Sequence, residues 1–395
     1  LKPFVGSRFV RPPMLPRSLF CKEQDRGLLM RASRGSTFSK EITSGPWYGD
    51  LRDCVLEVAS TCATESEAVK VLPSSDKSET WKRDFEAFNI SSFTPLDLER
   101  FQFDHIIRPA ADGLHAQIEV HIDHVAGTKV VGKRFPRAYL RDSPAEFRES
   151  DSFCGEDPWT EMFLAVQLGQ GATRVRGVLP CYGIFTDERG DVLLMMEYAP
   201  SGDVFELASC LGEPGPGREA KAAQVLCSLL EGVKRLHCLG IAHRDISAEN
   251  ALGIVRSDGG DLEVALLDFA MAVHDRDLHA VTGTNGKLMY RPPESVAEDA
   301  VYDARAADLF ACGVVGYALA VGNYPWQSTA GGCKAFDYVK KNGFLRFLQK
   351  RTIPVGSNKV PVADILSPGF QAVLVALLDL DPARRNDLSE MLLKV

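Results

Sequence analysis

The sequence lacks the signals of several protein classes. No apolar run is as long as the roughly 18 residues that a transmembrane helix needs, so no transmembrane segment is predicted. The ten cysteines include no C-x-x-C pair, which argues against a zinc site or a redox motif. The formal net charge of -8 argues against nucleic acid as the main partner. With 45% hydrophobic and 25% charged residues, the composition is that of a globular protein.

The first residues contain no acid. Residues 1–20 carry Lys2, Arg8, Arg11 and Arg17, which indicates a targeting remnant or, without a continuous apolar core, a disordered basic arm. The chain begins with Leu1, so we expect a fragment or a processed product. We predict residues 1–95 to be an N-terminal extension, partly disordered. Within it, 63–72 reads as a short helix and 73–79 as a linker.

From Phe101 onward the pattern changes. Short segments rich in Val and Ile predict strands at 101–107, 116–125, 129–135, 178–185 and 192–199. Apolar residues at helical spacing predict helices at 159–169, 217–240, 307–322 and 368–380. A small strand-rich half followed by a larger helical half predicts an α+β bilobal fold, with the junction near Glu197–Gly202.

One octapeptide, HRDISAEN at 243–250, carries chemical groups at a suggestive spacing. Asp245 can accept a proton, and Asn250 offers an amide oxygen to a metal ion. Asp268 follows an apolar strand in LLDFAMA and adds a carboxylate. Phosphoryl transfer needs these groups, namely a base at the acceptor hydroxyl, metal ions on the phosphates, and cations that offset charge. With these motifs in order, the chain resembles eukaryotic-type protein kinases.

The resemblance implies a small antiparallel-sheet N-lobe (96–199) and a larger helical C-lobe (200–395) in one kinase domain, 96–395. It also implies ATP and Mg²⁺. Lys133 would hold the nucleotide phosphates and Glu161 would pair with it, with Glu146 and Glu149 as alternatives. Asp245 would be the catalytic base, and Asn250 and Asp268 would hold the metal. Further nucleotide contacts are assigned to Gly113, Ile118, Met196, Glu197 and Ala199.

Three further positions match structural residues of the family. Glu294 in YRPPES resembles the glutamate of a buried ion pair, with Arg385 as its partner or Arg384 as the adjacent candidate. Asp308 resembles the helix aspartate that holds the backbone of the catalytic loop.

The glycine pattern of the family is incomplete. Ala111 and Ala116 replace two glycines of the phosphate-covering loop, and Ala270 replaces the glycine after Asp268 and Phe269. An added Cβ disfavours positive φ and keeps the backbone from phosphate. We expect a weaker hold on nucleotide and a stiffer segment after Asp268.

Position 247 also departs from the family pattern. Ser247 stands where the family usually places a lysine against the transferring phosphate, and Lys287 in GKLMYRPPE stands where a threonine is usual. We hypothesise a positional swap, in which Lys287 reaches the site on its flexible stem and Ser247 supplies the hydroxyl. The alternative is that Lys287 is a solvated loop residue.

The leading interpretation is a serine/threonine kinase that acts on protein substrates. Asp203 and Glu249 favour basic substrates, or are solvated acids, and Thr282 and Thr284 are candidate phosphorylation sites. A pseudokinase that serves as a binding or scaffold module is the alternative, and a small-molecule kinase ranks third.

The loop sequences HRDISAEN and GKLMY, together with the insertion at 331–351, resemble those of divergent kinases of alveolate-like protists. The scattered cysteines favour reduced thiols in the cytoplasm, while a secreted protein with a disulfide stays open. The sequence leaves the oligomeric state and the substrate undetermined.

Overall fold

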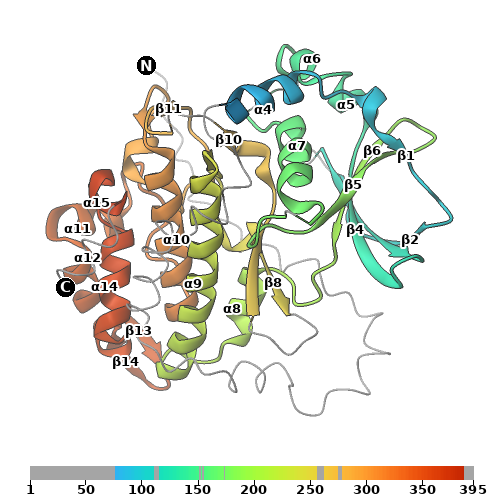
Figure 1. The fold of residues 1–395 in the computed structure, drawn as a ribbon. Coiled ribbons are helices and arrows are strands. Elements are labelled where there is room, and N and C mark those ends of the chain that lie inside the picture. Colours follow the sequence, from blue (N-terminus) through green and yellow to red (C-terminus); the bar gives the residue numbers. More distant parts are fainter. Residues whose placement is uncertain are drawn as a thin grey trace, which may run out of the picture.

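The computed structural model describes residues 76–110, 115–150, 153, 155–172, 174–255, 262–274 and 278–386. Ala111, Gly113 and the helix predicted at 63–72 lie outside these residues. The chain forms two lobes, one around a six-stranded sheet and the other mainly helical (Figure 1). The predicted bilobal α+β fold is confirmed.

The N-lobe sheet has the strand order β1-β5-β6-β4-β3-β2 and is antiparallel except where β1 joins β5. Its strands are β1 (Thr94–Pro95), β2 (Phe101–Arg108), β3 (Gln117–Asp123), β4 (Thr128–Phe135), β5 (Cys181–Thr186) and β6 (Val192–Glu197). Its helices are α4 (Asp76–Glu86), α5 (Arg137–Leu140), α6 (Pro144–Arg148) and α7 (Pro158–Gly169).

The C-lobe is built around two long helices, α9 (Pro216–Cys238) and α10 (Ala304–Val321). Around them lie α8 (Val204–Cys210), α11 (Lys334–Asn342), α12 (Phe344–Lys350), α13 (Val362–Ile365), α14 (Pro368–Leu377) and α15 (Pro382–Asn386). Two-stranded antiparallel sheets complete the described part of the lobe: β7 (Ile241–Ala242) with β10 (Val273–His274), β8 (Ala251–Val255) with β9 (Leu262–Leu266), β11 (Val281–Thr282) with β12 (Val301–Tyr302), and β13 (Thr352–Val355) with β14 (Asn358–Pro361).

Helix α10 is the centre of the C-lobe core. It begins three residues before the predicted 307 because Asp303 caps it, accepting the amides of Arg305 and Ala306. A Cβ added at Gly316 would lie 2.7 Å from Leu226 of α9, so glycine permits this close helix packing. By length and composition α10 could cross a membrane, but 83% of that stretch is buried inside the protein, which accounts for its apolar character.

Residues 76–95 pack on the N-lobe. The predicted linker is wrong at 76–79, which form the first turn of α4. Phe85 of α4 lies 5.2 Å from the ring of Phe163 on α7, and Phe88 lies 5.9 Å from Trp159 on the same helix. These rings place α4 against α7 (Figure 1). The domain boundary at 95/96 stays a prediction.

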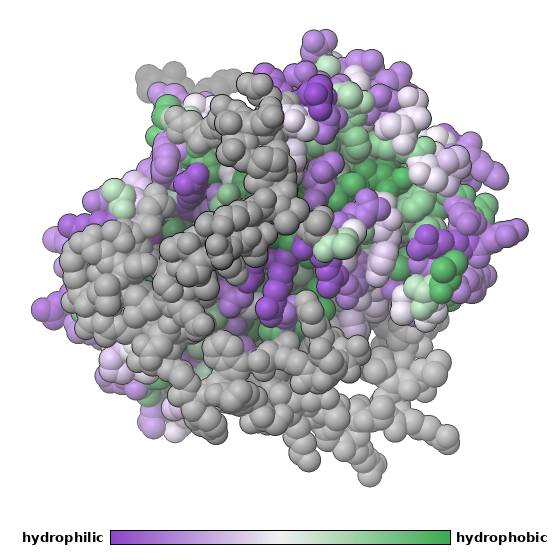
Figure 2. Space-filling view, in the orientation of Figure 1, coloured by the Kyte–Doolittle hydropathy of each residue, from purple (hydrophilic) through white to green (hydrophobic). Residues whose placement is uncertain are grey.

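Most large apolar side chains that remain exposed in the described residues belong to the N-lobe, among them Leu98, Phe103 and Val125. Apolar residues are correspondingly visible on the N-lobe side of Figure 2.

Cys238 is disulfide-bonded, so the expectation of reduced thiols is wrong at that residue, whereas Cys312 and Cys333 are free.

A buried ion pair joins two distant parts of the C-lobe. The guanidinium of Arg385 is fully buried and donates to Glu294 Oε1, and its Nε donates to the Ala306 carbonyl at 3.1 Å. Burial lowers the pKa of Arg385 to about 9. The structure therefore assigns the predicted partner of Glu294 to Arg385, while Arg384 is 67% exposed.

We expect Arg385→Met to lower the free energy of unfolding by about 3–5 kcal/mol, because Glu294 would be left without its partner. The matched control, Arg384→Met, should cost less than about 1 kcal/mol. Urea denaturation followed by fluorescence measures both. Equal losses in the two variants would contradict the assignment.

Candidate functional site

A buried lysine and glutamate meet between the lobes. Lys133 on β4 donates from Nζ to Glu161 Oε1 on α7 at 2.5 Å, and the same Nζ lies 3.4 Å from Asp268 Oδ1. Lys133 is 8% exposed and Glu161 is 2% exposed. Asp157 caps the start of α7 by accepting the amides of Trp159 and Thr160, and this cap fixes the turn that carries Glu161. The pairing predicted between Lys133 and Glu161 is confirmed.

The buried charges of this pair shift one another's pKa. Burial raises the pKa of Glu161 to about 7, against the opposing attraction of Lys133. Burial would lower the pKa of Lys133, but Asp268 and Glu161 outweigh it and raise that pKa. Burial would raise the pKa of Asp268, but Lys133 and His243 outweigh it and lower that pKa. The neighbouring charges thus keep Lys133 cationic and Asp268 anionic.

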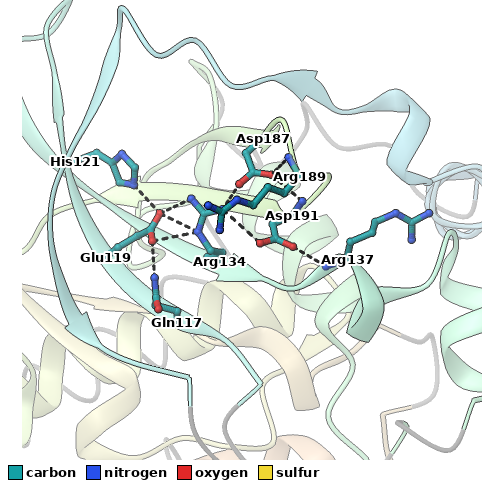
Figure 3. Close-up of polar contacts among 8 residues, drawn as sticks. All are labelled: Gln117, Glu119, His121, Arg134, Arg137, Asp187, Arg189 and Asp191. Carbon is teal, nitrogen blue, oxygen red and sulfur yellow. Dashed lines mark hydrogen bonds and ion pairs between the residues drawn. The ribbon is translucent and has the colours of Figure 1, made fainter.

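A polar network on the opposite face of the sheet braces the strand that carries Lys133 (Figure 3). Successive side chains of β4 alternate between faces, so Arg134 lies on the face of the sheet opposite to Lys133. Arg134 donates to both carboxylate oxygens of Glu119 and to Asp187, and Glu119 also contacts His121 Nε2 at 2.8 Å. Burial would raise the pKa of Glu119, but its hydrogen bonds lower that pKa to about 2. The network ties β3, β4 and the β5–β6 turn together.

The loop 243–250 is held to α10 by one carboxylate. Asp308 accepts the backbone amides of His243 and Arg244 at 2.8 Å each, as the resemblance implied. His243 Nε2 contacts the Leu267 carbonyl at 3.0 Å, which links the loop to the segment that carries Asp268. The backbone of Arg244 has a φ of 64°, and these contacts hold it there.

The side chains of this loop converge on Asp245. Asn250 Nδ2 donates to Asp245 Oδ2 at 2.6 Å and to the Asp245 carbonyl at 2.9 Å. The Asp245 Oδ1 atom is buried and has no hydrogen-bond partner among the described residues. Burial raises the pKa of Asp245, against the opposing charge of Lys287. An acceptor oxygen without a donor is suited to receive a hydroxyl hydrogen.

Lys287 reaches this loop. Its Nζ donates to Ser247 Oγ at 2.6 Å and lies 3.2 Å from Glu249 Oε2. Ser247 is fully buried, so the lysine ends inside the site. Lys287 is therefore not only a solvated loop residue: its side chain remains 40% exposed, but its ammonium group contacts Ser247. Ser247 and Lys287 are brought together as the swap hypothesis expects, and their role in transfer stays a prediction.

A metal ion would find suitable ligands at Asn250 and Asp268. Because Asn250 Nδ2 donates to Asp245, the amide orientation leaves its Oδ1 available to a cation. The Asp268 side chain is 36% exposed and anionic. The described residues contain no cluster of three or more His, Cys, Asp or Glu side chains that could hold a metal. This set fits Mg²⁺, which takes one or two protein oxygens and completes its shell with phosphate and water.

Two of the alanines that replace glycines of the family, Ala116 and Ala270, cause no backbone strain. Ala270 lies in the 3-10 turn Phe269–Met271, and neither it nor Ala116 has a positive φ. The Ala270 carbonyl accepts the amide of Asp157 at 2.8 Å, so this turn is tied to the start of α7. Alanine is thus accommodated at both positions.

The remaining predicted contacts line the sheet and the junction. Ile118 and Met196 lie on the Lys133 face, since Ile118 is opposite Lys133, and Met196 is opposite Val131 of the same strand. Glu197 ends β6, and Ala199 follows in the connection to α8. Their roles in nucleotide binding stay predictions.

Sequence reasoning missed the use of two acids. Asp203 is only 9% exposed and caps α8, accepting the Glu206 amide at 2.7 Å. Burial raises the pKa of Asp203 to about 6. Glu249 contacts Lys287, a pairing that the 38-residue separation of the two residues conceals in the sequence.

The candidate phosphorylation segment lies beside Arg244. The Nη2 atom of Arg244 donates to the Thr282 carbonyl at 2.5 Å.

Comparison with known proteins bears on this site. A family model described as protein kinase domain matches residues 167–394. Serine/threonine-protein kinase GIN4 of Saccharomyces cerevisiae is 30% identical over 208 residues, which is 53% of this chain and 16% of that protein. Testis-specific serine/threonine-protein kinase 3 of Homo sapiens is 27% identical over 180 residues, 45% of this chain and 64% of that protein. The chain thus spans a small part of GIN4 and just under two thirds of the human relative.

Gly286, next to Lys287, gives a test of the site geometry. Its φ is +80°, and an added Cβ would lie 2.8 Å from the Arg244 carbonyl. Gly212 is a matched control, with a φ of +81° and nothing within 4 Å. Both alanine variants should lose about 1–2 kcal/mol from positive φ. Only Gly286→Ala should lose about 1–3 kcal/mol more, from the clash, in thermal unfolding. Equal losses would show that the two loops are not packed as described.

Proposed function

Because this chain belongs to the protein kinase domain family, we propose that it transfers the γ-phosphoryl group of ATP to serine or threonine hydroxyls of protein substrates. The single observation that carries the proposal is the contact of 2.6 Å between Lys287 Nζ and Ser247 Oγ. It brings a cation to a loop whose usual lysine is absent, beside the buried carboxylate of Asp245, whose Oδ1 has no hydrogen-bond partner among the residues that the structure describes.

The reaction follows from the charges of the site. The substrate hydroxyl oxygen forms a bond to the γ-phosphorus, the bond from that phosphorus to the bridging oxygen breaks, and ADP leaves with the bond electrons. The hydroxyl proton passes to the Asp245 carboxylate. Lys133, held by Glu161, binds the α- and β-phosphates, and Lys287 offsets charge on the moving group. Mg²⁺ held by Asn250 and Asp268 neutralises phosphate charge when bound.

The described residues give little support to the pseudokinase alternative. A binding module has no need of a lysine at the catalytic loop, because charge there serves transfer and not packing. Lys133 contacts Glu161 and Asp268, and Asn250 contacts Asp245. The glycine loop, part of which lies outside the described residues, is the feature that would favour the alternative.

We expect Asp245→Asn to lower kcat by about 10²–10⁴-fold, because the proton acceptor is lost. Lys287→Met should lower it by about 10²-fold, because a charge that stabilises the transition state is lost. Transfer of labelled γ-phosphate from Mg-ATP to a protein mixture measures both.

Lys340→Met is the matched control for the lysine. Lys340 is 47% exposed and 3.4 Å from Asp337, while Lys287 is 40% exposed and 3.2 Å from Glu249. The control should keep wild-type turnover. If Lys287→Met matches it, the lysine has no part in transfer. If Asp245→Asn equals wild type, the kinase proposal itself fails.

A second prediction concerns pH. Because Asp245 must be ionised to accept a proton, kcat should fall as the pH drops through its pKa. Lys287 opposes the burial that raises this pKa. Removing the cation in Lys287→Met raises the pKa further, so the acidic limb of the kcat profile should move to higher pH. An unmoved limb in the residual activity of the variant would show that the two groups do not interact.

A further inference from the structure

The ammonium group of Lys287 is shared between two acceptors. An ammonium has three donors, and Ser247 Oγ and Glu249 Oε2 take two of them at 2.6 and 3.2 Å. The third is left for a phosphoryl oxygen. A carboxylate this close to the ammonium offsets part of its field, because opposite charges at such a distance largely cancel at a third group. The pairing with Glu249 therefore limits what Lys287 can do for the transferring phosphate.

Glu249 is anchored at one oxygen and open to solvent. Tyr290 OH donates to the same Oε2 at 3.4 Å, and Tyr290 OH and Tyr324 OH are 2.8 Å apart. The Glu249 side chain nevertheless remains 30% exposed. A charged group arriving from solvent can reach it without unfolding the loop.

Other carboxylates lie near Glu249. Glu249 and Glu206 both act electrostatically on Asp203, so three carboxylates lie near one another at the start of α8 and the end of the catalytic loop. Lys287 is the cation paired with Glu249 among the described residues. A cation from outside is thus attracted to Glu249 and competes with Lys287 for it.

We propose that Glu249 couples the charge of the substrate to Lys287: a basic residue of the substrate pairs with Glu249 and releases Lys287 toward the transferring phosphoryl group. This inference rests on the proposed kinase function. In it, Glu249 is a positioning residue that acts through Lys287. A basic substrate therefore raises turnover as well as affinity, whereas simple recognition by a carboxylate would change KM alone.

The test uses two synthetic peptides that differ only in an arginine or an alanine on the N-terminal side of the acceptor serine. Steady-state kcat and KM are measured for wild type, Glu249→Gln, Lys287→Met and the double variant. Wild type should turn over the arginine peptide about two- to fivefold faster, the range that a partly exposed ion pair supports. Glu249→Gln should raise kcat on the alanine peptide to that of the arginine peptide. In the Lys287→Met background, Glu249→Gln should change kcat on neither peptide.

Glu231→Gln is the matched control. Glu231 pairs with Arg235 on α9 at 3.3 Å and is 33% exposed, close to the geometry of Glu249 with Lys287. This variant should keep the wild-type ratio of the two kcat values.

Three results would overturn the inference, and a fourth separates it from the function on which it rests. Glu249→Gln that changes only KM for the arginine peptide indicates plain recognition. An equal fall of kcat on both peptides indicates a structural role. An unchanged effect of Glu249→Gln in the Lys287→Met background shows that it does not act through the lysine. No transfer by wild type to either peptide, or to the protein mixture, means that the kinase proposal has failed.

Discussion

The balance between carboxylates and ammonium groups around Lys133 and the loop 243–250 is the constraint on which the site depends. Glu161, Asp245 and Asp268 are brought close together, and the phosphates of a nucleotide would add further negative charge. Such a site is stable only if cations enter it, since unpaired buried charge is costly. Lys133 supplies one cation from the sheet, and Lys287 supplies another from the segment after β11. For the charge balance of the site, the place of a lysine in the sequence matters less than the place of its ammonium group in the structure.

The rest of the fold holds these groups at fixed places. Asp308 ties the catalytic loop to the central helix of the C-lobe, and the buried pair of Glu294 and Arg385 closes the segment that follows Lys287 against the same helix. On the N-lobe, the Arg134 network fixes β4 from the opposite face of the sheet, so that Lys133 points toward Glu161 and Asp268. The aromatic contacts of Phe85 on α4 and of Phe88 just after it hold α7, and with it Glu161. Each contact lies away from the chemistry and limits the motion of one charged group.

Local patterns in the sequence were enough for the long elements and for the motif residues. Helices α7, α9, α10 and α14 were predicted to within a few residues because apolar spacing and packing agree along them. The loop 243–250 could be placed because its residues carry chemistry at short spacing. The start of α4 was missed, since its polar first turn reads as a linker and its stability comes from rings on a distant helix.

The charge pairings could be predicted only in part. The proximity of Ser247 and Lys287 was predicted from their complementary exchange, but not the contact of Lys287 with Glu249. That contact depends on the path of a loop with a positive-φ glycine at Gly286, which no periodicity records. Asp203 was predicted either to favour basic substrates or to be a solvated acid. The second alternative is wrong, because Asp203 caps α8 and is nearly buried. Where a side chain has two plausible roles, tertiary packing determines which role it has.

The measurement that tests the central claim most directly is the turnover of a chain in which the exchange is reversed. Ser247→Lys combined with Lys287→Thr returns the lysine to the catalytic loop and the hydroxyl to the later segment. Lys287→Thr alone should lose about 10²-fold in kcat, and the double variant should regain most of it at an unchanged unfolding midpoint. A stable double variant that is no more active than Lys287→Thr alone would contradict the account.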